Sequence, residues 1–98
     1  MFVLLVRYKC KPGCRDAYFD AIRKGHIDEL SRAEEGCIRY EYSYGIADDE
    51  LLLTEVWRDA AAIEFHKSSA HFARLGEIKA EYVENTEFMK FSAEQVSL

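Results

Sequence analysis

Histidine is the side chain best suited to move protons near neutral pH, and the three histidines of this chain all fall on apolar faces of expected helices. On a helical wheel His26 lies one turn from Ile22 and one turn from Leu30, which points its ring toward the expected sheet. His66 ends a short apolar helix, and His71 begins another. Each imidazole is either a hydrogen-bonded core residue or a base in a dry pocket. With three aimed at one sheet, both interpretations stay open.

The same histidines are also potential metal ligands. His66 and His71 are separated by about 140° around a continuous helix, so they converge only if the chain turns at Ser68-Ser69. The sequence has no HExxH spacing. Cys10 and Cys14 lack the two-residue spacing of a zinc knuckle and have no second pair. We therefore expect no bound metal.

Other common chemistries lack their motifs. The chain has no G-x-S-x-G elbow for a nucleophile and no identifiable partner for a catalytic cysteine. It has no glycine-rich phosphate loop and no G-x-G-x-x-G for a nucleotide or flavin. An enzyme built on this chain is expected to work without a cofactor.

Aromatic residues make up 13% of the chain and are either core or the walls of a pocket for a flat organic molecule. Glu55 lies on the same strand face as Leu53 and Trp57. If buried, its carboxylate would orient an imidazole; otherwise it marks an exposed strand end. The candidate substrate-binding residues are Trp57, Phe72, Tyr40, Tyr42, Glu55 and Phe65.

Six elements must position these side chains. Alternating or continuous apolar patterns predict strands, and apolar residues at helical spacing predict helices. Asp59 and Ser69 are expected to cap two helical segments that Ser68-Ser69 separates. The expected ranges are strand 2–10, helix 14–34, strand 38–44, strand 51–57, a helix broken in two over 60–82, and a strand from 85 to 91.

This order, βαββαβ, predicts an α+β, ferredoxin-like fold: a four-stranded antiparallel sheet of order 4-1-3-2 with helices on one face. Strands 2–10 and 51–57 are apolar on both faces, so an open sheet face would expose more apolar surface than monomers usually tolerate. A second copy of the sheet is the simplest cover. We expect a homodimer.

Length and charge limit the partners. Ninety-eight residues predict a single domain over 1–98. A net charge of −5 without a basic run excludes nucleic acid and membrane surfaces as expected partners. The opening apolar run is too short for a signal peptide, and three cysteines are an odd count. They are expected to be reduced thiols of a cytoplasmic protein.

Three stretches carry a family resemblance. Glu34-Glu35-Gly36-Cys37, the run from Leu51 to Asp59, and Phe65–Ser69 with His71-Phe72 together resemble the antibiotic biosynthesis monooxygenase family of dimeric α+β barrels. Better-known members of that family oxidise quinols, anthrones and related polyphenols with O2 and use neither metal nor flavin. The resemblance implies a pocket near Trp57, with a histidine as the base.

In that scheme His66 or His71 removes a substrate proton, Trp57 and Phe72 form aromatic walls, and Tyr40 or Tyr42 donates to developing oxygen charge. His26 is a further candidate base.

Two other branches of this family and one non-enzymatic role are alternatives. The stretch from His66 to His71 also resembles the branch that isomerises the phosphorylated autoinducer-2 signal, whose substrate calls for cationic anchors such as Arg7, Arg39 or Lys90. The haem-degrading branch fits less well, because its pattern has a Trp at position 66 and a His where this chain has Gly76. A carrier or sensor that only binds a small molecule would show the same aromatic pocket.

Overall fold

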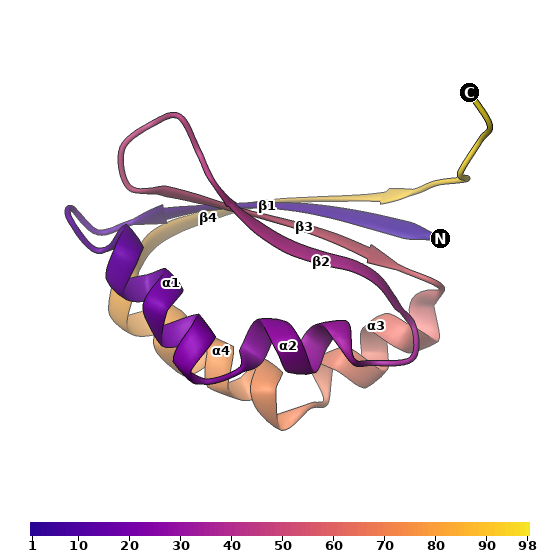
Figure 1. Ribbon diagram of the computed structural model, residues 1–98, viewed down its shortest axis with the longest axis horizontal. Helices are drawn as coiled ribbons and strands as arrows, with labels where there is room; N and C mark the ends of the chain where they lie inside the picture. Colours follow the sequence, from indigo (N-terminus) through magenta and orange to yellow (C-terminus); the bar gives the residue numbers. More distant parts are fainter.

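Four strands form one antiparallel sheet, and all four helices pack against the same face of it (Figure 1). The computed structural model describes all residues from Met1 to Leu98. The elements are β1 (Phe2–Cys10), α1 (Arg15–Lys24), α2 (Ile27–Arg32), β2 (Cys37–Tyr44), β3 (Glu50–Trp57), α3 (Ala60–Lys67), α4 (Ala70–Tyr82) and β4 (Val83–Ser92). The predicted ferredoxin-like α+β fold is confirmed.

The sheet order is β2-β3-β1-β4, as predicted, with β1 and β3 in the middle. Its register sets Tyr40 of β2 opposite Glu55 of β3, and Glu55 opposite Leu4 of β1. Opposed residues share a sheet face. These three side chains therefore form one row on the face that meets the helices, where all three are buried.

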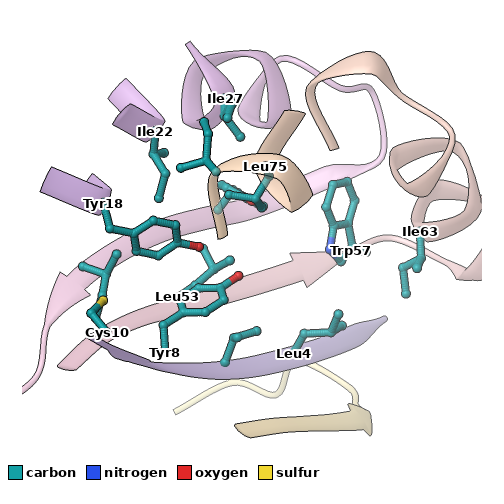
Figure 2. Packing of buried hydrophobic residues seen from close by; sticks show 14 of the residues in the cluster. Leu4, Tyr8, Cys10, Tyr18, Ile22, Ile27, Leu53, Trp57, Ile63 and Leu75 are labelled. Carbon is teal, nitrogen blue, oxygen red and sulfur yellow. The ribbon is translucent and has the colours of Figure 1, made fainter. Parts of the chain in front are cut away.

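The core lies between this face and the helices. Fifteen buried hydrophobic residues form one cluster, among which Trp57, Tyr18 and Ile22 are completely buried. Figure 2 shows Tyr8 and Leu53 rising from the sheet toward the side chains of the helices. Alternate residues of β1 and β3 supply the lower layer, which explains the period-two burial of both strands.

The expected single helix over 14–34 is wrong, because the chain breaks after Lys24. Gly25 disfavours a helix interior, and His26 adopts a left-handed backbone conformation with φ of 55°. The break changes the direction in which the apolar face of the following helix points. Ile27 is therefore fully buried, whereas Leu30 has 48% of its surface exposed. The prediction that His26 faces the sheet is wrong for the same reason.

The expected alternation of β2 also fails at its first residue. The pairing of β2 with β3 shifts register between Cys37 and Arg39, and Ile38 is 55% exposed. Such a bulge adds one residue to a strand and reverses the sheet face toward which the following side chains point. Cys37 therefore faces Trp57 in the register while Ile38 turns outward.

The predicted caps of the two last helices are confirmed. The Oδ1 atom of Asp59 accepts from the backbone N–H of Ala62 at 2.8 Å, and Oγ of Ser69 accepts from that of Phe72 at 3.1 Å. Each side chain satisfies an amide that the first turn leaves free. The caps fix an elbow between α3 and α4.

The far face of the sheet carries apolar side chains with no helix over them. Leu5 of β1 is 38% exposed, and its partner Met89 in β4 is 54% exposed. Phe91 continues the row at 48%. A hollow of about 320 Å³ on this face is lined by Leu5, Leu52 and Met89, among others. No helix of the structure has the length and apolarity needed to cross a membrane.

We predict that a second copy of the chain covers this face, so the protein should scatter light at about twice its 11.4 kDa chain mass. Leu52→Glu should give a folded monomer, because a dimer would bury the new charge unpaired. Ile46→Glu adds the same charge at a fully exposed loop position and should leave the mass unchanged. A wild-type monomer at micromolar concentration would contradict the prediction.

Candidate active site

One buried carboxylate joins two of the predicted histidines. The Oε2 atom of Glu34 lies 2.6 Å from Nδ1 of His66 and 2.8 Å from Nε2 of His71. Glu34 stands in the turn between α2 and β2, His66 in the last turn of α3, and His71 in the first turn of α4. The Glu34 and His66 side chains are 6% and 5% exposed. Three separate elements therefore meet at one oxygen atom.

The elbow between α3 and α4 makes this meeting possible. The Ser69 hydroxyl donates to the backbone oxygen of His66 at 2.6 Å, and it also accepts from the N–H of Phe72. Its two bonds tie the end of α3 to the start of α4. The condition for His66 and His71 to converge, a turn at Ser68-Ser69, is met, and their ring centroids lie 5.6 Å apart.

The geometry fixes which ring nitrogens are free. An ionised carboxylate only accepts hydrogen bonds, so each nitrogen that faces Glu34 must donate. A neutral His66 that donates from Nδ1 keeps a lone pair on Nε2, and a neutral His71 that donates from Nε2 keeps one on Nδ1. Burial lowers the pKa of His66 below its usual value, although Glu34 opposes this shift. His66 is therefore held as a neutral imidazole with a bare Nε2.

Aromatic rings surround His66. Its ring centroid lies 4.6 Å from that of Trp57, 5.3 Å from that of Phe72 and 5.7 Å from that of Tyr40. Figure 2 shows Trp57 standing on β3 and reaching toward the helices. Trp57 is fully buried and Tyr40 is 1% exposed. This dry wall excludes water from the imidazole and strengthens every charge interaction that it makes.

Glu55 is buried, with 7% of its surface exposed, which excludes the exposed strand end. It accepts a hydrogen bond from the Trp57 indole N–H at 2.9 Å and so orients the indole instead of an imidazole. Burial, aided by the charge of Glu34, raises the pKa of Glu55 to about 7, while the bond from Trp57 opposes the rise. Glu34 fills the orienting role that the sequence suggested for Glu55.

Two predicted residues lie apart from the cluster. The His26 side chain is 67% exposed and has only Glu29 beside it, at 3.6 Å. Phe65 is 66% exposed and is not among the rings that pack against His66, although it borders a groove of about 490 Å³ between α2 and α3 that Glu34 also lines. Tyr42 reaches the cluster indirectly, since its hydroxyl lies 3.3 Å from that of Tyr40. The structure therefore gathers His66, His71, Trp57, Phe72 and Tyr40.

The aromatic rings of the cluster are packed against His66, with centroids 4.6 to 5.7 Å from its own. The groove between α2 and α3 reaches Glu34 but is not lined by Trp57, His66 or His71. His71 has 14% of its side chain exposed and Phe72 is 39% exposed, so the cluster meets solvent at the start of α4. A ligand that reaches His66 from that side must displace Phe72 or His71.

The raised pKa of Glu55 predicts a specific loss of stability with pH. A folded pKa of about 7 against an unfolded value near 4.5 means that the folded state retains a proton that the unfolded state has lost. The contribution is complete below pH 4.5 and falls by about 3 kcal/mol as pH rises through 7.

Urea unfolding between pH 4.5 and 8 measures this contribution as the stability of wild type minus that of Glu55→Gln, whose amide oxygen still accepts from Trp57. The exposed Glu41→Gln controls for the loss of one charge. Burial of His66 acts in the opposite direction, and the subtraction removes it. A flat difference across this range would show that Glu55 is ionised in the fold.

Comparisons with known proteins agree with this architecture. The family model described as antibiotic biosynthesis monooxygenase matches residues 1–77. YcnE of Bacillus subtilis (strain 168) is 33% identical over 73 residues, which cover 74% of this chain and 75% of that protein. The structure of PA3566 from Pseudomonas aeruginosa has a TM-score of 0.85 at 26% identity and covers 96% of this chain and 94% of that one. A structure from Nitrosomonas europaea shares the fold, with a TM-score of 0.84 at 23% identity over 95% of this chain and 98% of that one. This chain belongs to the antibiotic biosynthesis monooxygenase family.

Proposed function

We propose that the protein is a cofactor-independent monooxygenase that oxidises a small aromatic substrate, a quinol, anthrone or polyphenol, with O2. The observation that carries this proposal is the Glu34–His66 pair, a carboxylate that holds a neutral imidazole against Trp57 and Phe72. Membership of a monooxygenase family supports the reaction class. The pair supplies the one function that such a reaction demands of the protein, a base in a dry aromatic site.

The proposed reaction begins with proton transfer to His66. A phenolic or enolic O–H gives its proton to Nε2 of His66, and the carboxylate of Glu34 stabilises the imidazolium that forms. The resulting anion is electron-rich enough to give one electron directly to O2. With an anthrone, a CH2 carbon loses two hydrogens and gains one oxygen atom, and the second oxygen leaves with the two hydrogens as water. The substrate is thus its own reductant.

The tyrosines are proposed to stabilise oxygen charge. Burial raises the pKa of Tyr40 and of Tyr42, so both hydroxyls keep their protons at neutral pH. A protonated phenol can donate to an anionic oxygen as it forms. When Phe72 moves aside to admit it, a flat ring would lie between Trp57 and Phe72 beside His66, and His71 supplies the second hydrogen bond to Oε2 of Glu34.

The isomerase alternative calls for cationic anchors, and the structure engages the candidates elsewhere. Arg7 lies on the open sheet face and pairs with Glu50 at 3.4 Å. Arg39 is 3.5 Å from Glu41, also on the surface. Lys90 stacks over the ring of Phe2, 5.0 Å from its centroid. The oxygenase is therefore the preferred function, and isomerisation or binding alone becomes an outcome of the tests.

Oxygen uptake tests the base. Metal-stripped protein should consume O2 with a suitable anthrone or hydroquinone, and His66→Ala should lower the rate by ~100-fold or more because proton transfer loses its acceptor. Glu34→Gln should also lower the rate, since an amide cannot stabilise the imidazolium. His26→Ala removes an exposed imidazole outside the cluster and should retain full activity. A folded His66→Ala protein with the wild-type rate would refute the assignment.

Ligand-induced thermal shifts separate the oxygenase from the isomerase. Menadiol-type quinols should stabilise wild type and should do so equally in Arg39→Ala and Lys90→Ala, because an apolar slot needs no cation. Small phosphosugars should stabilise none of them. Stabilisation by phosphosugars alone, lost in either variant, would overturn the oxygenase in favour of the isomerase, since a phosphate needs a charge-assisted clamp.

A further inference from the structure

We propose that Glu34, His66 and His71 also bind a divalent transition-metal ion, with Zn²⁺ as the best fit, and that the bound ion switches off the base. Metal binding by the cluster goes beyond the proposed function. The inhibition rests on that function, since it assumes that His66 is the base. Separate experiments test the binding and the inhibition.

The cluster supplies a complete set of ligands for zinc. The candidate ligand atoms of Glu34, His66 and His71 all lie within 4.8 Å of one another. Two imidazoles and one carboxylate are the protein ligands of a common class of zinc site, which leaves a fourth position open. Both ring nitrogens already face the same oxygen, at 2.6 and 2.8 Å.

The ion would take the place of the two protons that Oε2 now accepts. Zinc bonds of about 2.0–2.1 Å in a tetrahedral site separate neighbouring ligand atoms by roughly 3.4 Å. Each nitrogen of His66 and His71 therefore has to move away from Glu34 by less than about 1 Å from its hydrogen-bonded position. Side-chain rotation on this scale needs no change in the elbow between α3 and α4.

A second, independent observation points to a missing ligand. The other carboxylate oxygen of Glu34, Oε1, is buried and has no hydrogen-bond partner, in a side chain that is only 6% exposed. Buried carboxylate oxygens are normally satisfied, because leaving one unpaired costs free energy. A cation at the cluster satisfies Oε1, either by direct bidentate ligation or through a metal-bound water.

The ion can reach the cluster from solvent on the α4 side. His71, which stands in the first turn of α4, is the most exposed of the three ligands at 14%. The second histidine–acid pair of the chain, His26 with Glu29, offers only two groups on an exposed surface. Glu34, His66 and His71 are the one group of three such residues in the chain that the geometry brings into ligating range.

Metal binding and proton transfer exclude each other at His66. A neutral imidazole carries one proton, and a metal on Nδ1 forces that proton onto Nε2. His66 then presents an N–H donor where the reaction requires a lone pair. A metal on Nε2 of His71 displaces the proton that faces Glu34 in the same way. The cluster thus has two exclusive states, one that transfers protons and one that holds metal.

Calorimetric titration with ZnCl2 tests the binding, using reduced, metal-stripped protein without substrate. We expect one ion per chain in wild type. Glu34→Gln and His71→Ala should each weaken binding by more than the ~10- to 100-fold typical of losing an outer-shell partner. His26→Ala and Cys14→Ser, which change another imidazole and a thiol, should bind like wild type. Absence of saturable binding, or wild-type affinity in Glu34→Gln or in His71→Ala, would overturn the site.

Histidine NMR of wild type guards against variants that fail to fold. Zinc should shift the ring resonances of His66 and His71 and leave those of His26 in place; a shift of His26 alone would overturn the proposal. Oxygen uptake then tests the switch. Zinc should inhibit wild type and a chelator should restore it, and zinc bound at the cluster without inhibition would refute the second part. If wild type consumes no O2 at all, the proposed function fails while the titration still decides the metal site.

Discussion

The structure depends on the burial of one carboxylate. Glu34 is almost fully enclosed, and a buried charge is tolerated only where polar partners surround it. Two imidazole N–H groups meet this demand at Oε2, whereas Oε1 has no hydrogen-bond partner. Because those imidazoles come from different helices, the elbow between α3 and α4 and the turn before β2 must be placed relative to one another within hydrogen-bonding distance.

The rest of the cluster follows from that placement. His66 lies against Trp57 while its Nδ1 faces Glu34, and Trp57 is itself held by Glu55. The two acids act on different partners, and the charge of Glu34 contributes to the raised pKa of Glu55. A chain of contacts thus runs from a surface turn through two histidines and an indole to the central strand.

The sequence predicted what depends on local pattern. The bounds of β1 and the sheet order follow from the alternation and the two-sided apolarity of the strands. The caps Asp59 and Ser69 follow from short-range hydrogen bonding. Each of these patterns can be recognised within about ten residues of sequence. The break at Gly25 was missed because the apolar spacing continues across it in sequence, although the left-handed backbone of His26 ends it in space. The bulge at Ile38 was missed for a similar reason, since the alternation of apolar and polar residues in the sequence continues across it.

The role of Glu34 was the main omission. It stands 32 residues from His66 and 37 from His71, and no periodicity connects residues across such distances. Its one signal was the Glu-x-Gly-Cys turn, which marked the family without indicating a function for the acid. The convergence of His66 and His71 was likewise conditional on a turn at Ser68-Ser69, and two serines alone do not specify the angle of that turn. Only the folded chain shows that both conditions are met together.

The central claim is that Glu34 holds His66 as a neutral ring with Nδ1 protonated and Nε2 bare. Long-range 1H–15N correlation spectra of protein labelled at histidine report the tautomer of each ring directly. At pH 7.5 we predict an Nδ1–H tautomer for His66 and an Nε2–H tautomer for His71, and both signatures should be lost in Glu34→Gln. A His66 ring that carries its proton on Nε2 at this pH would contradict the account, because no lone pair would then face the substrate.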